Sequence, residues 1–274
     1  MNRSLLTACL LLSTSFALAG CKVQLEGEGE VETPVLYRGD PESASTPYIS
    51  GLPVRIISAN GGVNVVPGGS DQIQVTFSPS VMGTEGAEDS AQRQMNELLS
   101  YSLGGNGEIV IQVIKDPSGA ISLAADIDVV LPAAFNGELS VLQDNGGVDL
   151  DLSGTGALST VVDSDNGSVN VVGARGRLDV VTDNGSVDVD VDAWSNADGQ
   201  VRSGNGSITV ALPADANGSM TVATTGQIIE QGLPASWTSA ENTAGKSYTM
   251  GTGVGGQVDI SNAEGLGDVT LIAR

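Results

Sequence analysis

The sequence predicts an all-β protein built as a parallel β-solenoid, or β-helix, with one short helix inserted at about residues 88–103. Three observations support this fold class. Alternating apolar residues fill the chain from Leu52 onward, and an Asn-Gly turn recurs about every 20 residues. A short strand of alternating apolar residues follows each of these turns. Self-similarity at such a period is typical of repeat architectures, in which each unit stacks on the next.

The composition narrows the classes of function. The 274 residues carry a net charge of −22, contain no histidine, and are 40% hydrophobic but only 3% aromatic. This hydrophobic content is enough for a sizeable core. The absence of histidine excludes Ser-His-Asp and Cys-His nucleophilic sites and histidine-ligated zinc. So acidic a chain would repel phosphates, and we therefore expect no nucleic-acid partner.

Residues 1–20 have the character of an export signal. Arg3 precedes an apolar run, Leu5 to Leu18, that is too short to remain as a membrane-spanning helix. The run ends in Leu18, Ala19, Gly20 and Cys21, which resemble the lipobox of bacterial lipoproteins at every position. This resemblance implies a lipoprotein whose Cys21 sulfur carries fatty-acyl chains such as palmitate, which would hold it to the lipid bilayer.

The cysteine count agrees with lipidation. Cys9 lies inside the signal, which leaves Cys21 alone in the mature chain and makes an internal disulfide impossible. Residue 22 is lysine rather than aspartate. By resemblance to enterobacterial lipoproteins, this residue favours the bacterial outer membrane, with the periplasmic or the surface face left open.

Residues 21–51 are predicted to form an acidic, flexible tether before a folded domain at 52–274. The stretch is rich in Glu, Gly, Pro and Ser and has no sustained apolar period. One later segment departs from the strand pattern, because Met95, Leu98 and Leu99 fall at helical spacing before Gly104 and Gly105. We expect an amphipathic helix there, covering an end or a flank of the β core.

The repeated turns allow two folds. Their asparagines, Asn145, Asn166, Asn184 and Asn205, are 21, 18 and 21 residues apart. An Asn-Gly pair between alternating strands is a strong hairpin signal, but a hairpin at Asn184 would set Asp179 opposite Asp190, which is unfavourable.

A parallel stack avoids this conflict. It aligns apolar residues of successive repeats in two inward columns, Val148, Val169, Val187 and Ile208 in one and Leu150, Val171, Val189 and Val210 in the other. Such stacked aliphatic columns need no aromatic residues, which suits this composition. We therefore favour the solenoid over the antiparallel meander.

The repeats and the chain's last residues resemble a known family. The Asn-Gly-[Ser/Gly]-Val-x-Val units, the Leu-Pro strand ends and the closing GQVDISNAEGLGDVTLIAR are similar to the putative-adhesin family, a bacterial domain of unknown function. That family is related to the auto-transporter adhesin head domain. Over about residues 52–274, the resemblance implies a single-stranded right-handed β-helix. The family has no established catalytic residues, so the resemblance supplies none.

The parallel stack also aligns polar residues on its outer face. Asp149, Asn170, Asp188 and Thr209 share one outward column, with Asp151 and Asp190 in the adjacent one. Carboxylates on a solvated face serve solubility and oppose edge-to-edge association. The alternative is Ca²⁺ binding, which uses six to eight oxygen ligands, and the candidate residues are Asp163, Asp165, Asp183, Asp188 and Asp190. No EF-hand or nonapeptide calcium loop is present in the sequence, and we expect no other cofactor.

These observations predict a non-catalytic, lipid-anchored protein of the cell envelope with an adhesin-like role in binding or display. Its ligand would be a protein or a polysaccharide. One alternative is a polysaccharide-active β-helix enzyme with paired carboxylates, but the chain has few aromatic residues for a sugar-binding groove. Another alternative is a periplasmic scaffold or envelope-sensing partner, which the sequence does not separate from an adhesin.

Overall fold

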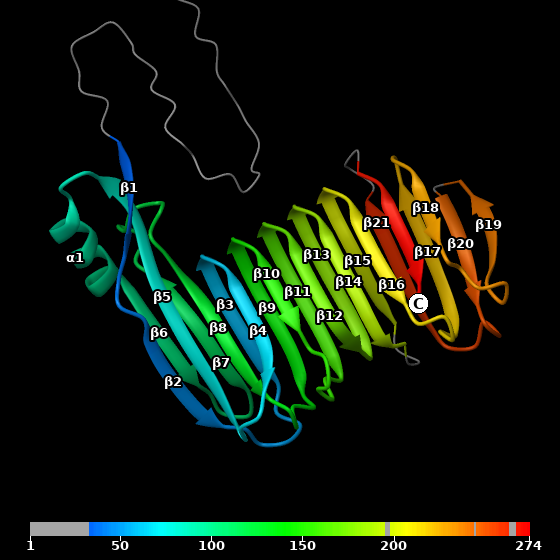
Figure 1. Cartoon of the computed structure of the whole chain (residues 1–274), viewed down its shortest axis with the longest axis horizontal. Coiled ribbons are helices and arrows are strands. Elements are labelled where there is room, and N and C mark those ends of the chain that lie inside the picture. Colours follow the sequence, from blue (N-terminus) through cyan, green and yellow to red (C-terminus); the bar gives the residue numbers. More distant parts are fainter. Residues whose placement is uncertain (1–32, 195–197, 244, 263–266) are drawn as a thin grey trace, which may run out of the picture. The chain divides into compact units, whose positions relative to one another are not determined.

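The computed structural model describes residues 33–194, 198–243, 245–262 and 267–274. Within these residues the strands form two 11-stranded sheets (Figure 1). In spatial order, the first sheet consists of β1 (Pro34–Arg38), β5 (Gln72–Thr84), β8 (Ala124–Pro132), β4 (Val63–Gly68), β10 (Val148–Asp151), β12 (Val169–Arg175), β14 (Val187–Ala193), β16 (Ile208–Leu212), β22 (Val269–Ala273) and β18 (Ile228–Gln231), and β2 (Glu42–Pro47) also pairs with β5.

The second sheet contains the strands that precede the repeated turns. Its order is β19 (Thr238–Asn242), β20 (Gly245–Met250), β17 (Gly218–Thr224), β21 (Gly256–Asn262), β15 (Gly199–Asn205), β13 (Arg177–Asn184), β11 (Ser159–Asn166), β9 (Glu138–Asn145), β3 (Val54–Asn60), β7 (Ile109–Lys115) and β6 (Leu99–Gly104). Buried side chains from both sheets belong to one hydrophobic core cluster.

The predicted single-stranded parallel β-solenoid is wrong, because both sheets mix parallel and antiparallel pairs. Antiparallel pairs join β1, β2 and β8 to β5, β6 to β7, and β20 to both β17 and β19. The physical reason lies in the extent of the repeat. The Asn-Gly units recur regularly only across the middle of the chain, whereas the segments before and after them fold back on themselves as antiparallel strands.

The middle of each sheet is parallel, and the two predicted inward columns are confirmed there. Val148 aligns with Val169, Val169 with Val187, and Val187 with Ile208, and the second column aligns likewise. Every member of the two columns is at most 2% exposed. The strands before and after the turns at Asn145, Asn166, Asn184 and Asn205 lie in different sheets, so these four turns connect the two layers and do not close hairpins.

Asparagines form a ladder at these turns. The Nδ2 of Asn205 donates to Oδ1 of Asn184, and the same bond repeats from Asn184 to Asn166, from Asn166 to Asn145 and from Asn145 to Asn60, at 3.0–3.1 Å. Each amide between the two ends of the ladder is therefore both donor and acceptor, which explains why asparagine recurs at this position. The glycine after each asparagine is explained by close approach. A Cβ on Gly185 would clash with the carbonyl oxygen of Gly167 in the neighbouring turn.

A buried polar column lies just inside the ladder. Thr182 Oγ1 donates to the carbonyl of Gly167 at 3.1 Å, and Ser203 Oγ donates to that of Gly185 at 2.8 Å. Gln143 and Asn262 donate in the same way to the carbonyls of Gly61 and Gly206. These bonds supply donors to turn carbonyls that are directed toward the core, where an unpaired carbonyl would be costly.

The helix α1 (Glu88–Leu98) is shorter than predicted. Leu99 has an extended backbone, φ −112° and ψ 143°, and begins β6, which pairs antiparallel with β7. Pairing with β7 satisfies the backbone of residues 99–104 and so overrides the helical spacing of Leu98 and Leu99. The helix buries Ala91 and Met95.

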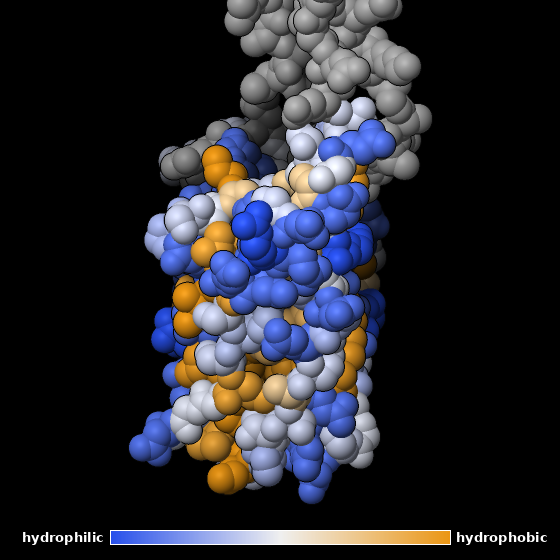
Figure 2. Space-filling view, turned by 90° about the vertical axis from the view of Figure 1, so that its left-hand side faces the viewer, coloured by the Kyte–Doolittle hydropathy of each residue, from blue (hydrophilic) through white to orange (hydrophobic). Residues whose placement is uncertain are grey.

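The end of the sheets where α1, β1, β2 and β6 lie is only partly apolar. Viewed from this end, hydrophobic residues lie among hydrophilic ones, most densely in the lower half of the view (Figure 2). Leu36 on β1 is paired with Met82 on β5, and the two residues are 47% and 42% exposed. Residues 34–47, expected to belong to the flexible tether, form β1 and β2 and pair with β5.

Candidate binding face

A polar row crosses the outer face of the first sheet. Its members occupy one register position on six adjacent strands, in the order Asp128, Asn64, Asp149, Asn170, Asp188 and Thr209. The predicted outward column from Asp149 to Thr209 is thereby confirmed, and the structure extends it by two residues. We call these six residues the acid–amide row.

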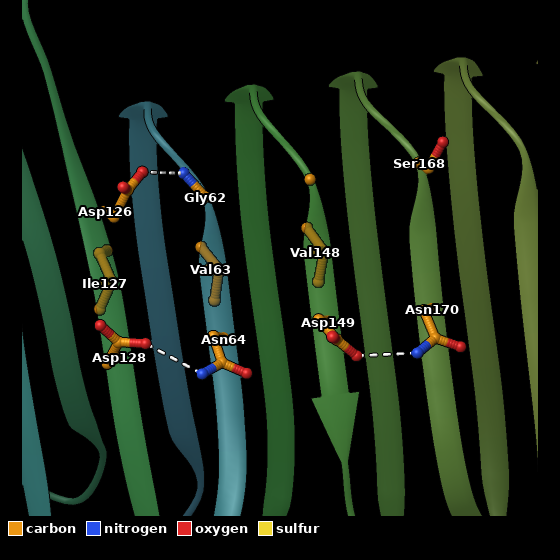
Figure 3. Close-up of a pocket in the computed structure, with 11 residues that line it drawn as sticks. Gly62, Val63, Asn64, Asp126, Ile127, Asp128, Val148, Asp149, Ser168 and Asn170 are labelled. Atoms are coloured by element: carbon orange, nitrogen blue, oxygen red, sulfur yellow. Dashed lines mark hydrogen bonds between the residues drawn. The ribbon is translucent and has the colours of Figure 1, made fainter. Parts of the chain in front are cut away.

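Acid and amide alternate in the row, and the amides donate to the acids. Asn64 Nδ2 donates to Asp128 Oδ1 at 2.9 Å, and Asn170 Nδ2 donates to Asp149 Oδ1 at 2.8 Å (Figure 3). An amide between two carboxylates separates their like charges and supplies a donor, which stabilises the cross-strand contact. The row therefore holds its carboxylates in fixed positions at the spacing of the strands.

A hollow of about 470 Å³ lies beside the row, over β8, β4, β10 and β12. Its lining includes Asp126, Asp128 and Asp149, together with Gly62 and Gly147. Asp126 Oδ1 accepts a bond from the Gly62 amide at 2.7 Å (Figure 3). Three carboxylates from two strands thus surround one concave part of the face.

Two glycines keep this hollow open. In later repeats a serine follows the turn glycine, at Ser168, Ser186 and Ser207. Gly62 and Gly147 take that place in two of the three units that line the hollow, and Ser168 takes it in the third. Neither glycine has a positive φ. A Cβ at either position would meet its nearest neighbour at 3.6 or 3.7 Å, which is ordinary contact. Neither the backbone conformation nor close neighbours require glycine at these two positions. The absence of a side chain there leaves room in the hollow and is not needed for folding.

Negative charge is compensated at one side of the face and not at the other. Asp192 accepts from Arg175 at 3.3 Å and from Arg274 at 3.1 Å, and Asp190 is also paired with Arg274. In contrast, none of the arginines or lysines that the structure describes forms an ion pair with Asp126, Asp128 or Asp149. Uncompensated charge on this face is therefore concentrated around the hollow.

Asp188 lies between these two regions. Burial raises the pKa of its carboxyl, and the neighbouring charge of Asp190 raises that pKa further. The fold therefore disfavours the ionised form of Asp188. None of the described residues donates a hydrogen bond to its carboxylate.

A second ionic cluster lies near the other end of the two sheets. Lys246 Nζ donates to Glu230 Oε1 at 2.8 Å, and the hydroxyl of Tyr248 donates to the same oxygen at 2.6 Å. These bonds lower the pKa of Glu230 and raise that of Lys246. Burial, with the bond to Glu230, raises the pKa of the Tyr248 hydroxyl. The contacts tie β18 of the first sheet to β20 of the second.

The calcium candidates lie in both sheets. Asp163, Asp165 and Asp183 are exposed on β11 and β13 of the second sheet, whereas Asp188 and Asp190 are on β14 of the first. The carboxylate of Asp190 is already paired with Arg274. Within the described ranges, no three side chains of His, Cys, Asp or Glu gather closely enough to hold a metal ion.

The lipidation residue lies outside the described residues. Cys21 and the lipobox residues Leu18, Ala19 and Gly20 all precede residue 33, and their assignment remains a prediction from the sequence. In the part of the chain that the structure covers, no helix has the length and apolar character needed to cross a bilayer.

Sequence reasoning did not single out Asp126, Asp128, Asn64 or the two glycines of the hollow. A signal for them was present, because Asn60-Gly61-Gly62-Val63-Asn64-Val65 matches Asn145-Gly146-Gly147-Val148-Asp149-Leu150 in pattern. Treating residues 60–65 as a further repeat would have placed Asn64 beside Asp149. The position of β8 beside β4 has no such signal, since β8 follows no Asn-Gly turn.

Comparison with solved structures finds the same fold in a putative cell adhesion protein from Clostridium sporogenes. The two chains share 12% sequence identity, and the match has a TM-score of 0.50 over 86% of this chain and 100% of the other. A putative adhesin from Bacteroides fragilis matches at 12% identity over 85% of this chain and 97% of its own, with a TM-score of 0.37. No family model matches the sequence, and no curated protein matches it either. The likeness to the Clostridium protein is one of fold alone.

Proposed function

We propose that this protein is a non-catalytic, adhesin-like binding protein of the bacterial envelope, held at the outer membrane by lipid on Cys21. We further propose that it binds a basic partner through the hollow of the first sheet. One observation carries the binding proposal. The carboxylates around the hollow have no cationic partner in the described residues, whereas Asp190 and Asp192 on the same face are paired with arginines.

The exposure of these carboxylates favours binding over catalysis. General acid catalysis by a carboxyl group requires a raised pKa, which enzymes obtain by burial or by a close second carboxylate. Asp126, Asp128 and Asp149 are all exposed, and each accepts a hydrogen bond from an amide. Exposed acidic side chains of this kind attract cations, which is the chemistry of a docking face.

A protein surface rich in lysine or arginine fits this face best. The acid–amide row presents carboxylates at fixed spacing, and complementary charge steers association and sets register. The open hollow over Gly62 and Gly147 has room for a long basic side chain. The fold shared with the Clostridium protein, itself described as a putative cell adhesion protein, supports a role in adhesion.

Binding can be tested with polylysine as the probe. We expect the triple variant Asp126→Asn, Asp128→Asn and Asp149→Asn to weaken binding roughly tenfold, because each exposed ion pair contributes about 0.2–1 kcal/mol. The matched control removes the same charge from the second sheet through Asp163→Asn, Asp165→Asn and Asp183→Asn. Equal losses in the two triple variants would show that net charge alone drives binding and would overturn the proposed site.

Location can be tested by treating intact cells of the native host with protease and blotting for the 52–274 body. Its loss from intact cells supports display at the surface, and a Cys21→Ser variant should then no longer fractionate with the outer membrane. Protection until the outer membrane is permeabilised would contradict the adhesin role and favour a periplasmic scaffold. Turnover of a polysaccharide by the purified protein would contradict the non-catalytic role.

A further inference from the structure

Asn-Gly pairs are chemically labile, and this chain contains eight of them. The amide nitrogen of the glycine can attack Cγ of the asparagine side chain. A C–N bond then forms, the side-chain amide leaves as ammonia with the proton of the glycine amide, and a cyclic imide results. Water opens the imide to aspartate or to isoaspartate. The reaction needs no other reactant, but it does need a glycine amide that is free to approach Cγ.

Most of the pairs are held against this reaction by hydrogen bonds. In the ladder, the amides of Gly61, Gly146, Gly167 and Gly185 each donate to the carbonyl of the next asparagine at 2.8–3.0 Å. The asparagine side chains before them are bonded to one another along the stack. Both the nucleophile and the carbon that it would attack are therefore fixed between neighbouring strands.

Three further pairs are held by their asparagine side chains. Oδ1 of Asn136 accepts from the Gly51 amide at 2.7 Å, and Oδ1 of Asn217 accepts from the Thr252 amide at 2.8 Å. Asn205 donates to Asn184 at the end of the ladder. In each case the side chain must leave a hydrogen bond before Cγ can turn toward the following glycine.

Asn106 differs from all of these. It lies with Gly107 in the loop that joins β6 to β7, and both residues are exposed. In the described part of the chain neither residue forms a hydrogen bond. Apart from its two chain neighbours, no residue has a heavy atom within 4 Å of the position that a Cβ on Gly107 would take. We propose that Asn106 is the site at which this protein undergoes spontaneous deamidation, while the ladder asparagines are protected by the stack.

The product would change the edge of the second sheet. Deamidation adds a carboxylate to the loop, and isoaspartate also inserts a methylene into its backbone. The loop ends β6, which is the last strand of that sheet. The change therefore falls on an edge strand, away from the acid–amide row and the ladder, and it does not depend on the proposed binding function.

Trypsin provides an internal comparison within one protein. Cleavage after Arg93 and Lys115 releases 94–115, whose one Asn-Gly pair is at Asn106, and cleavage after Arg177 and Arg202 releases 178–202, whose one pair is at Asn184. The full chain is incubated folded in mildly alkaline buffer, and the deamidated fraction of each peptide is followed by mass spectrometry. We expect Asn106 to convert at least about tenfold faster, because opening of core strands costs nearly the global free energy of unfolding.

Two controls make the result specific. In urea, where the stack is lost, the two peptides should deamidate at similar rates. An Asn106→Ser variant should remove the fast conversion and leave the rate at Asn184 unchanged. Equal rates at Asn106 and Asn184 in the folded chain, or conversion at Asn184 before Asn106, would overturn the proposal.

Discussion

At the scale of single residues, Asp188 is the carboxylate that the fold accommodates least well. The row gives an amide donor to Asp128 and to Asp149, but none of the described residues donates to Asp188, and Asp190 lies two residues along the same strand. Burial and the charge of Asp190 raise its pKa, so the native state binds a proton there more tightly than the unfolded chain does.

This raised pKa predicts the direction of an Asp188→Asn effect. At neutral pH the variant should be more stable than the parent, by less than about 1 kcal/mol for so exposed a site, because the ionised carboxylate is lost. As the pH falls through the raised pKa, Asp188 becomes protonated in the parent, and the difference should shrink. Urea denaturation at neutral and acidic pH measures this. A variant that is less stable at neutral pH would contradict the predicted cost of the charge.

At the scale of strands and turns, the buried hydroxyls of β11 and β13 differ in a way that the alternating pattern does not show. Thr182 on β13 is 1% exposed and donates to the Gly167 carbonyl. Thr160 on β11 is fully buried, and its hydroxyl has no partner in the described residues. The same residue type therefore stabilises a turn at one position and leaves a polar atom unpaired at the other.

Replacement of each threonine by valine should separate these roles. Thr182→Val removes the donor to a turn carbonyl and should cost about 1–2 kcal/mol of unfolding free energy. Thr160→Val removes a hydroxyl that has no partner, so it should be neutral or stabilising. Urea denaturation of the two variants, with unchanged m values, is the measurement. Equal losses in the two variants would contradict the proposed difference between a hydrogen-bonded and an unpaired hydroxyl.

At the scale of the whole molecule, net charge opposes folding. The sequence carries a charge of −22, and the ion pairs of the described residues involve few of its acids. Repulsion among the remaining carboxylates destabilises the compact state and is reduced by salt. The alternation of acids with amides in the row lessens this repulsion locally but does not remove it.

Salt should therefore stabilise this protein. Raising the ionic strength from about 0.01 M to about 0.15 M shortens the screening length from about 30 Å to about 8 Å. We expect Tm to rise, by about 2–4 °C for each 1 kcal/mol of repulsion relieved. The triple variant at Asp126, Asp128 and Asp149 should show a smaller rise than the parent. A Tm that falls with added salt would mean that attractive ion pairs outweigh the repulsion.

Much of the local structure could be predicted from the sequence. The alternating residues gave the two inward columns and the outward column that contains Asp149 and Asp188, because side chains of a strand point to opposite faces with a period of two. The spacing of the turn asparagines gave the parallel register of the middle strands. The hollow was less accessible, since two of its three carboxylates are on β8, which follows no Asn-Gly turn.

The sequence by itself determined the all-β character, the repeated turns and the parallel pairing of the middle strands, because these follow from nearest-neighbour geometry and from a period that repeats. Only the tertiary structure decided the mixed sheets, the end of α1 at Leu98 and the hollow beside Asp126. These features depend on pairing between segments that share no repeat, such as β5 with β8 and β6 with β7. The period of the repeats aligns only segments that share it, so it does not encode this pairing.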